Sequence, residues 1–398
     1  MDLAGKKIIL GLSGGIACYK AAEFTRALTG AGATVQVVMT QAATHFITSV
    51  TMQALSGQPV FADQWDARID NNMPHIDLTR DVDAIVIAPC SADFMAKLAH
   101  GACDDLLSTL CVARPATLPL LVAPAMNVEM WQNPATRRNA ATLAADGVQL
   151  LGPDAGQQAC GETGMGRMLE PEQLLAEVIA SFQPKLLAGK RVLLTAGPTF
   201  EPIDPVRGIT NLSSGKMGYA LARAAREAGA DVTLISGPTA LPAPYDVQRL
   251  NVCSAQQMHD LVMAQVAAQD VFIAVAAVAD WRVANASAQK LKKNADGSAP
   301  ELRFEQNPDI LATVAALPNK PYCVGFAAES ENLLQYGEAK RVKKGIPLLV
   351  GNIGHQTFGR DDNELILFDA HGHAQLPRAS KHHLARQLIG EIARRLPA

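Results

Sequence analysis

The sequence has neither a strong excess of charge nor a long hydrophobic run. Its 398 residues carry a formal net charge of -3, which gives no electrostatic case for binding nucleic acid or an anionic membrane. The apolar run at 271–279 is far shorter than a transmembrane helix. The apolar stretch before Ser13 is too short for the core of a signal peptide. We therefore expect a soluble protein without nucleic-acid or membrane partners.

The spacing of a disulfide framework is also missing. The seven cysteines are an odd number and are scattered over a long chain. That pattern is typical of a reducing compartment, so we expect the protein in the cytoplasm.

The glycine fingerprint GxGxxG of dinucleotide-binding folds is absent, yet the chain begins the same kind of unit twice. Residues 7–39 and 191–236 each run from an apolar strand through a Gly/Ser loop and an Ala-rich helix into a second apolar strand. The first loop carries Ser13-Gly14-Gly15, and the second ends in Ser213-Ser214-Gly215-Lys216. Free backbone N–H groups at the start of such a helix attract phosphate. Two different loops predict two ligands and two active sites.

Apolar strands alternate with helical stretches in both halves, which indicates parallel sheets covered on both faces. Breaks near 183–190 divide the chain into domains 1–185 and 190–398. We expect an α/β fold: two Rossmann-like three-layer domains with mostly parallel sheets. Residues 287–306 interrupt the alternation and predict a two-stranded β-arm, with a turn at 294–297. The strands are expected at 83–88, 119–123, 148–151, 191–195, 231–235, 271–276, 321–325 and 346–350.

Three residues of the first half are candidates for chemistry. His75 has only its near-neutral pKa to recommend it and is otherwise an ordinary surface or capping histidine. Asn127 follows a strand at the carboxyl edge of the sheet, where ligands bind, but also suits a turn or a helix cap. Cys160 lies among five glycines between 152 and 166, a composition that suits a mobile flap closing over a site. A thiol on such a flap is placed to exchange protons or electrons with a ligand.

In the second half, SSGK resembles the end of a Walker A motif, but position 210 is Thr where that motif needs Gly. The alternative is a loop in which Asn211, Ser213 and Ser214 grip a phosphorylated substrate. Arg207 is a further partner for an anion. The lysines at 290–293 and 340–344 are also compatible with a solvated charged face.

Four motifs of the first half together resemble the flavin-containing cysteine decarboxylase family, in particular the phosphopantothenoylcysteine decarboxylases. They are LGLSGGIA, PHIDL around His75, PAMN at 124–127 and ACGETGMGRM at 159–168. The resemblance implies bound FMN and a Rossmann-like subunit that forms trimers, often four to a dodecamer. The loop at 89–94 departs from the family's usual PASANT. The implied FMN contacts are Ser13, Gly14, Ile16, Thr40, Pro89, Ser91 and Ala92.

The implied chemistry explains these residue types. Loss of CO2 from cysteine needs an electron sink, which a flavin provides by oxidising the side chain to a thioaldehyde. His75 would act as acid and base, Asn127 would hold the substrate carboxylate, and Cys160 would give a proton when the enethiol is reduced again.

Motifs of the second half resemble the CTP-using bacterial phosphopantothenate–cysteine ligases. They are DPVRGITNLSSGKMG at 204–218, AAVAD at 276–280, KLKK at 290–293, NPDIL at 307–311 and GFAAE at 325–329. The whole chain thus resembles a family of bifunctional enzymes of bacterial coenzyme A synthesis.

The resemblance implies that 4'-phosphopantothenate attacks CTP to give an acyl-cytidylate, from which cysteine displaces CMP. Mg2+ and Lys290 would screen the two anions, and Asn211 would handle the intermediate. This half is expected to dimerise through the 287–306 arm. The implied CTP contacts are Ala274, Val275, Ala276, Asp280, Lys290, Pro308, Asp309, Ile310, Leu311, Phe326, Lys340 and Lys344.

Two other classes compete with this interpretation. The absence of GxGxxG at both strand–loop starts counts against a dinucleotide-dependent oxidoreductase. The presence of both Asn127 and Cys160 counts against a non-catalytic flavoprotein regulator.

Overall fold

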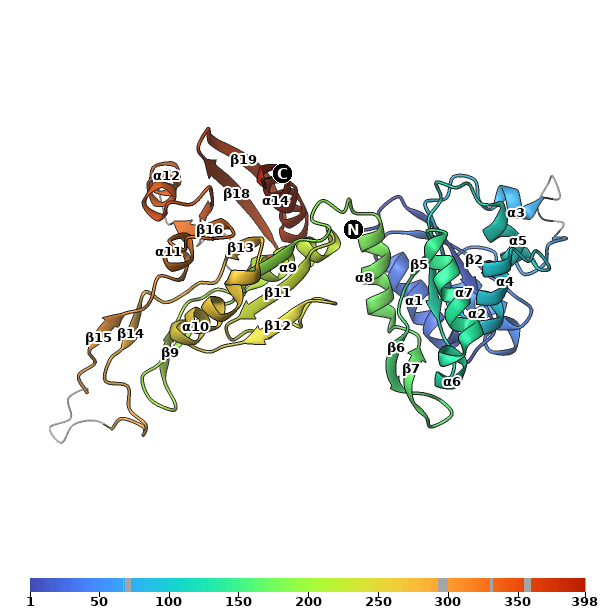
Figure 1. Ribbon diagram of the computed structural model, residues 1–398, viewed down its shortest axis with the longest axis horizontal. Helices are drawn as coiled ribbons and strands as arrows, with labels where there is room; N and C mark the ends of the chain where they lie inside the picture. The colour runs from blue at the N-terminus through green and yellow to red at the C-terminus, as the bar shows by residue number, and fades with distance from the viewer. Residues whose placement is uncertain (67, 69–72, 293–299, 330–331, 354–358, 398) are drawn as a thin grey trace. The chain divides into compact units, whose positions relative to one another are not determined.

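The computed structural model describes residues 1–398 except 67, 69–72, 293–299, 330–331, 354–358 and 398. Contacts divide the chain into two compact units, Met1–Phe182 and Gln183–Ala398. Each unit is built around one mostly parallel sheet flanked by helices (Figure 1). The predicted α/β fold with two Rossmann-like units is confirmed.

The first unit contains a five-stranded parallel sheet in the order β2-β1-β3-β4-β5. This is the flavodoxin-like order, in which ligands bind where the strand order reverses, between the first and third strands. The strands are β1 (Lys7–Leu12), β2 (Thr34–Met39), β3 (Ala84–Cys90), β4 (Leu120–Pro124) and β5 (Gln149–Leu150). The helices are α1 (Cys18–Gly30), η1 (Ala43–His45), α2 (Ser49–Ser56), α3 (Pro74–Asp77), α4 (Ala92–His100), α5 (Leu106–Ala113), α6 (Val128–Gln132), α7 (Pro134–Ala145) and α8 (Pro171–Ser181).

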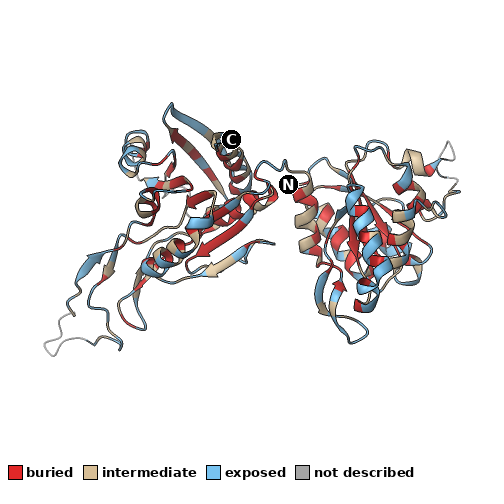
Figure 2. Ribbon diagram, in the orientation of Figure 1, coloured by how far each residue is buried: buried red, intermediate tan, exposed pale blue. Residues whose placement is uncertain are grey.

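A hairpin separate from this sheet joins β5 to α8. Its strands β6 (Asp154–Gln157) and β7 (Thr163–Arg167) pair antiparallel, and Figure 1 shows them beside α6. Most of their residues are exposed, as Figure 2 shows. This hairpin corresponds to the predicted glycine-rich flap.

The second unit contains an eight-stranded sheet in the order β12-β11-β8-β13-β16-β17-β18-β19. Its first six strands are parallel and have the 3-2-1-4-5-6 order of the Rossmann fold, with the reversal between β8 and β13. The strands are β8 (Arg191–Ala196), β11 (Asp231–Ser236), β12 (Gln248–Asn251), β13 (Val271–Ala274), β16 (Tyr322–Glu329), β17 (Leu348–Ile353), β18 (Asp362–Asp369) and β19 (Gly372–Ser380). The helices are α9 (Lys216–Glu227), α10 (Ala255–Gln265), η2 (Val266–Ala268), α11 (Ile310–Ala315), α12 (Leu333–Lys344) and α14 (Lys381–Arg395).

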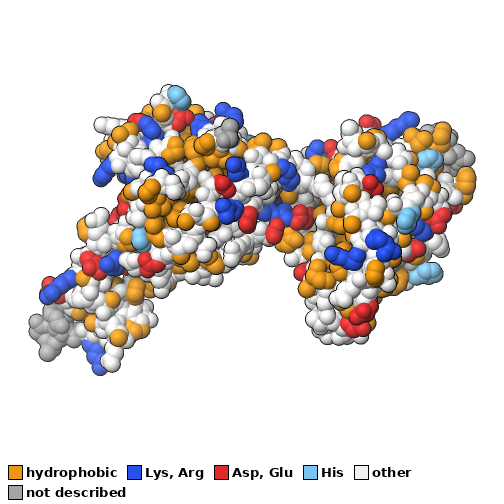
Figure 3. All heavy atoms as spheres, in the orientation of Figure 1, with side chains coloured by type: hydrophobic (Ala, Val, Ile, Leu, Met, Phe, Trp, Pro, Cys, Tyr) orange, Lys and Arg blue, Asp and Glu red, His pale blue; other side chains and the backbone are white. Residues whose placement is uncertain are grey.

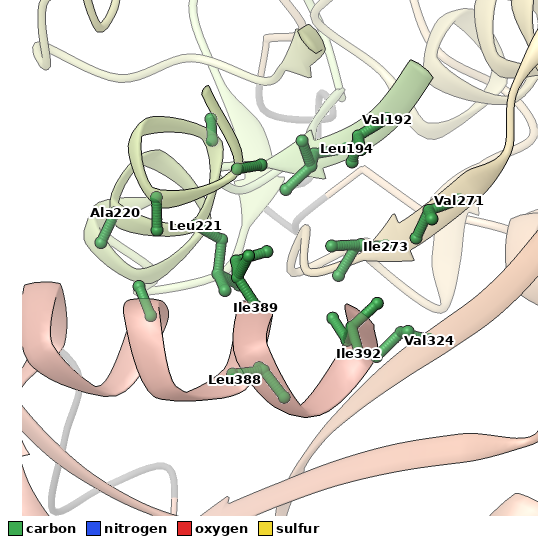
Figure 4. Packing of buried hydrophobic residues seen from close by; sticks show 14 of the residues in the cluster. Val192, Leu194, Ala220, Leu221, Val271, Ile273, Val324, Leu388, Ile389 and Ile392 are labelled. Atoms are coloured by element: carbon green, nitrogen blue, oxygen red, sulfur yellow. The ribbon is translucent and has the colours of Figure 1, made fainter. Parts of the chain in front are cut away.

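Both faces of this sheet are buried. Successive residues of a strand point to opposite faces, and here they belong to two different hydrophobic clusters. Val192 and Leu194 lie in one cluster, and Leu193 between them lies in the other. Figure 4 shows the first cluster, in which Ile389 and Ile392 of α14 pack against β8, β13 and β16 beside α9. Near-continuous apolar strands are the sequence signature of such a doubly covered sheet.

A buried carboxylate joins the two helices of this layer. The Glu227 side chain at the end of α9 is 3% exposed. It accepts hydrogen bonds from Arg223 Nε at 2.8 Å and from Arg386 Nε of α14 at 2.7 Å. The pair of arginines therefore balances a charge that would be costly to bury alone.

Two antiparallel strands, β18 and β19, extend the sheet beyond β17. Their register shifts between Asn363 and Leu365, and the outer strand β19 is largely exposed and contains Pro377. Neither strand of this pair was predicted from the sequence, and β19 has no apolar run that would indicate it.

The predicted arm is present, with different bounds. Strands β14 (Trp281–Val283) and β15 (Phe304–Gln306) pair antiparallel. The first strand thus lies before residue 287, because Trp281 pairs with Gln306 and fixes the register. The predicted turn at 294–297 lies outside the described residues. Two further short strands, β9 (Phe200–Pro202) and β10 (Gly208–Thr210), form a hairpin after β8.

The surface is mixed in charge. On the face drawn in Figure 3, basic and acidic side chains are interspersed over each unit. Within the described part of the chain, no helix combines the length and the apolar character needed to span a bilayer.

Candidate active sites

A first cavity lies where the strand order of the first sheet reverses. Ser13 directly follows β1 and is 1% exposed. Its Oγ donates to the Pro89 carbonyl at 2.9 Å and accepts from the Ser91 N–H at 2.8 Å. Ser13 thereby ties the loop after β1 to the loop after β3. Ser91 in turn caps α4 by accepting from the Phe94 N–H at 3.1 Å.

The cavity has a volume of about 380 Å³. Four of the predicted FMN-contacting residues line it: Gly14, Ile16, Ser91 and Ala92. The other three, Ser13, Thr40 and Pro89, do not line it and instead hold its loops. Thr40, for example, donates its N–H to Leu12 O at 3.0 Å and accepts from Ala43 N.

The residues at this cavity fit a flavin phosphate and ring. Among the described residues, the N–H groups of Gly14 and Ile16 have no acceptor, and a Cβ on Gly15 would meet nothing within 4 Å. Unsatisfied N–H groups beside a helix start suit a phosphate. The Ile16 and Tyr19 side chains, each 61% exposed at the cavity, offer apolar surface to a planar ring.

Asn127 caps a helix and also lines the cavity. It caps α6, because its Oδ1 accepts from the N–H groups of Glu129 at 2.8 Å and Met130 at 3.2 Å. Since two donors fix the oxygen, the amide nitrogen Nδ2 must face the cavity. Nδ2 lies 3.7 Å from Cys160 Sγ and hydrogen-bonds to Glu162 Oε2. The side chain therefore presents a donor to the cavity.

Several contacts between the flap and the loop around Asn127 hold Cys160 close to Asn127. Gln158 Oε1 accepts from the Val128 N–H at 2.9 Å, and Gly166 O accepts from the Met126 N–H at 2.9 Å. A Cβ on Gly164 would come 2.5 Å from Val128 Cγ2, and one on Gly166 would come 2.4 Å from Met126 O. These two glycines thus serve close packing of the hairpin on the Asn127 loop, a reason distinct from the mobility predicted for the flap.

Two cations at this cavity were not singled out from the sequence. Lys20 is 4% exposed and donates to Met168 O at 3.0 Å and to Glu170 Oε1 at 2.9 Å. Arg167 of the flap pairs with the same carboxylate. Burial would raise the pKa of Glu170, but the hydrogen bond and charge of Lys20, with Arg167, outweigh it and lower that pKa. The available signal for Lys20 was its position one turn into the helix after the SGG loop.

His75 is not brought to this cavity. It lies in α3 with a partly exposed side chain, and the residues lining the cavity in the described structure do not include it. The chain therefore unites Asn127 and Cys160 but leaves His75 elsewhere on the same unit.

Burial separates Cys160 from most other thiols. All seven cysteines are free, and Cys160, Cys103 and Cys253 are the exposed ones. Burial raises the pKa of Cys18 to about 11 and that of Cys111 to about 12. Cys90 follows the same rule: it is fully buried and burial raises its pKa strongly, so its thiol packs in the core below the loop.

A second cavity, of about 290 Å³, lies where the strand order of the second sheet reverses. Loops after β8, β10 and β13 line it, together with residues 326–328 of strand β16 itself. Asn211 Nδ2 donates to Ala277 O at 2.9 Å, and Thr195 Oγ1 accepts from the Ala276 N–H at 3.3 Å. Of the predicted CTP and substrate contacts, the lining includes Asn211, Ser213, Ser214, Val275, Ala276, Phe326 and Lys340.

Three lysines from different elements surround this second cavity: Lys216, Lys340 and Lys381. Lys216 Nζ binds Asp361 Oδ1 at 2.7 Å, and Lys340 Nζ binds Glu329 Oε1 at 2.5 Å. Lys381 is 6% exposed, and burial followed by the charge of Lys216 lowers its pKa. Such a group of amines favours a polyanionic ligand. Lys216 stood in the SSGK motif, but nothing in the sequence pointed to Lys381.

Among the described residues, the other predicted contacts with CTP and substrate in the second unit do not line this cavity. Lys344 binds both carboxylate oxygens of Asp309, at 2.9 and 2.8 Å. Burial would raise the pKa of Asp309, but the Lys344 hydrogen bond outweighs it and lowers that pKa. The set outside the cavity is Ala274, Asp280, Lys290, Pro308, Asp309, Ile310, Leu311, Lys344 and Arg207.

Arg207 holds the chain next to Lys290. Its guanidinium binds Asp204 Oδ2 at 3.0 and 2.6 Å and Leu291 O at 2.9 Å. Asp204 also accepts from the Leu291 N–H at 3.1 Å, and the Arg207 hydrogen bond lowers the pKa of Asp204 well below its usual range. Lys290 itself is exposed. Across the described part of the chain, no group of His, Cys, Asp or Glu has the arrangement of a metal site.

Comparison with known proteins accounts for both units. Residues 1–183 match the Flavoprotein family model, and residues 187–396 match that of the DNA/pantothenate metabolism flavoprotein C-terminal domain. The coenzyme A biosynthesis bifunctional protein CoaBC of Vibrio vulnificus (strain CMCP6) is 51% identical over 394 residues, covering 98% of each chain. That of Escherichia coli (strain K12) is 46% identical over 401 residues, covering 99% of this chain and 98% of the relative. A crystal structure of the C-terminal domain of a CoaBC covers 53% of this chain and 97% of its own, at 38% identity and a TM-score of 0.46. This chain belongs to the family of the coenzyme A biosynthesis bifunctional proteins CoaBC.

Proposed function

We propose that the chain makes 4'-phosphopantetheine in two steps on two units. Residues 190–398 condense 4'-phosphopantothenate with cysteine at the expense of CTP, and residues 1–185 decarboxylate the product. The observation that carries this assignment is the pairing of the Asn127 amide with the Cys160 thiol in one cavity, apart from a lysine-rich cavity in the other unit. The two matching family models divide the chain in the same way.

In the decarboxylase unit, Asn127 Nδ2 binds the carboxylate that is to leave. Its orientation is fixed before substrate arrives, because Oδ1 is held by the α6 backbone. Gly14, Ile16, Ser91 and Ala92 would hold FMN, which would supply the oxidation to a thioaldehyde and the later reduction of the enethiol. Cys160 gives the proton that this reduction needs, and it lies 3.7 Å from the amide that positions the substrate.

His75 acts in this scheme from a second copy of the chain. The support is that it lies apart from the cavity of its own unit, while a near-neutral acid and base is still required. Co-expressing His75→Asn with Cys160→Ser tests it, since mixed oligomers would contain cavities with both native groups. Activity should return in part. No recovery would mean that each cavity uses its own histidine.

In the ligase unit, the lysines neutralise the nucleotide. Lys216, Lys340 and Lys381 line the cavity and would face the CTP phosphates, whose charge Mg2+ would also screen. Lys290, in the loop of the arm, would add a further positive charge. Asn211, Ser213 and Ser214 hold phosphopantothenate and its acyl-cytidylate, with Arg207 as a further anion partner. Cysteine's amine then displaces CMP.

Incubating the protein with 4'-phosphopantothenate, cysteine, CTP and Mg2+ tests the whole scheme. Mass spectrometry should find 4'-phosphopantetheine, CMP, pyrophosphate and CO2. Omitting CTP should stop the formation of all four products, and supplying phosphopantothenoylcysteine without CTP should restore only 4'-phosphopantetheine and CO2. Failure of that restoration would remove the decarboxylase assignment.

We further propose a cytoplasmic homo-oligomer, a dodecamer built from trimeric decarboxylase contacts and dimeric ligase contacts through the arm. Seven free cysteines are consistent with a reducing compartment. Light scattering should give twelve times the mass of the chain. A mass of one or two chains would contradict this assembly.

A further inference from the structure

The Asn127 amide has a carboxylate partner supplied by the chain itself. Glu162 Oε2 accepts the hydrogen bond of Asn127 Nδ2 and lies 3.6 Å from Cys160 Sγ. One oxygen atom thus touches both groups that define the decarboxylase cavity.

The position of this carboxylate is set by the flap. Glu162 O accepts from the Gln158 N–H at 2.8 Å, which closes the tip of the hairpin. Gln158 is anchored in turn to the Val128 N–H, one residue after Asn127. The backbone of the tip therefore aims Glu162 at the amide.

No cation balances Glu162 among the described residues: its side chain contacts Asn127 and Cys160 only. The two cations that line the cavity, Lys20 and Arg167, are both paired with Glu170. Because its charge is not balanced, the Glu162 carboxylate repels the carboxylate of an incoming ligand. It also occupies Asn127 Nδ2, the donor to which that ligand would bind.

We propose that Glu162 is a resident substitute for the substrate carboxylate, which the substrate must displace from Asn127 before it can react. The proposal rests on the proposed role of Asn127 in carboxylate binding. It makes Glu162 a residue that sets affinity for carboxylate ligands. A ligand without a carboxylate at this position has no need to displace it.

Two inert analogues of phosphopantothenoylcysteine test this directly. In the serine analogue a hydroxyl replaces the oxidisable thiol and the carboxylate is kept, and in the ethanolamine analogue the carboxylate is also missing. Their inhibition constants against decarboxylation of phosphopantothenoylcysteine are measured with the flavin-loaded full chain. The variants are Glu162→Gln and Glu162→Ala, with Glu129→Gln as the control for loss of an exposed charge on α6.

Both Glu162 variants should bind the serine analogue roughly ten-fold more tightly, the factor that corresponds to the lower end of the contribution of a hydrogen bond to a charged group. Binding of the ethanolamine analogue should stay unchanged, as should both constants in the control. Equal tightening of both analogues would identify Glu162 as a steric barrier, and weaker binding of the serine analogue would make it a substrate ligand. Either result, or no change, overturns the proposal. A wild-type protein that does not decarboxylate its substrate would instead refute the proposed function.

Discussion

Replacing Asn127 by Asp separates the two tasks of this residue. Its Oδ1 caps α6, and its Nδ2 faces the cavity. Aspartate is as good an N-cap as asparagine, so the cap should be kept, and the free energy of unfolding should fall only by the repulsion between the new carboxylate and Glu162, about 1 kcal/mol in a solvated site. The donor facing the cavity, however, becomes a carboxylate.

The expected loss of activity follows from two terms. A hydrogen bond to a charged group contributes about 1.5–3 kcal/mol, and two carboxylates about 4 Å apart in a solvated site repel by about 1 kcal/mol. Together they amount to about 3 kcal/mol, or roughly 150-fold in kcat/KM. Asn127→Ala should lose only the first of these terms, about 2 kcal/mol or roughly 30-fold in kcat/KM, and, in addition, about 1 kcal/mol of stability from the lost cap.

The assay supplies phosphopantothenoylcysteine directly and measures phosphopantetheine by mass spectrometry, with unfolding followed in urea. Asn133→Asp is the matched control, because Asn133 caps α7 by accepting from the Ala135 N–H at 2.9 Å and does not line the cavity. The control should keep wild-type activity. If Asn127→Asp retained a third or more of wild-type kcat/KM, the amide would not hold the substrate carboxylate.

Four further outcomes are expected. Lys290→Gln should reduce ligation about 100-fold and leave decarboxylation of supplied phosphopantothenoylcysteine intact, and loss of both would argue for misfolding. Cys160→Ser should stop at a product two hydrogens short of phosphopantetheine by mass, because a hydroxyl is a far weaker acid than a thiol, and normal product at the wild-type rate would reduce Cys160 to a structural role. Glu227→Ala should lower the free energy of unfolding of the second unit by about 3 kcal/mol, because it removes the buried carboxylate that two arginines share. The control Glu301→Ala, at an exposed ion pair, should change that free energy little. Alkylation at about pH 8 should modify the exposed thiols of Cys103, Cys160 and Cys253. It should spare the buried thiols, whose raised pKa keeps them protonated: Cys18, Cys90, Cys111 and Cys323. Labelling of a buried thiol in the folded protein would contradict this expectation.

The parallel sheets could be predicted because their strands are buried on both faces. Runs such as KIILGL and RVLLTA are apolar at nearly every position, which indicates burial on both faces. Strand β19 could not be predicted, since GHAQLPRAS is held by pairing with β18 and not by an apolar face. The bounds of the arm were wrong for a similar reason: the register of Trp281 with Gln306 decides them.

Those residues of the candidate site that follow the end of a strand could be predicted from the sequence. Asn127 and Ser91 each follow a strand of the first sheet, so their meeting at one edge follows from parallel pairing. The contact of Glu162 with Asn127 depends on the turn of a hairpin whose packing no local pattern encodes. Lys381 was missed because it joins its cavity from a helix far along the chain.

The outermost strand of the second sheet bears on aggregation. A sheet edge offers a row of unpaired N–H and C=O groups that can recruit a strand from another molecule. In β19 this row is broken at Pro377, which has no N–H, and the register shift against β18 bends the strand nearby. The opposite edge, β12, is only four residues long. Neither edge therefore presents a long continuous template, and the sheet ends in strands that discourage unintended fibre-like growth at high protein concentration.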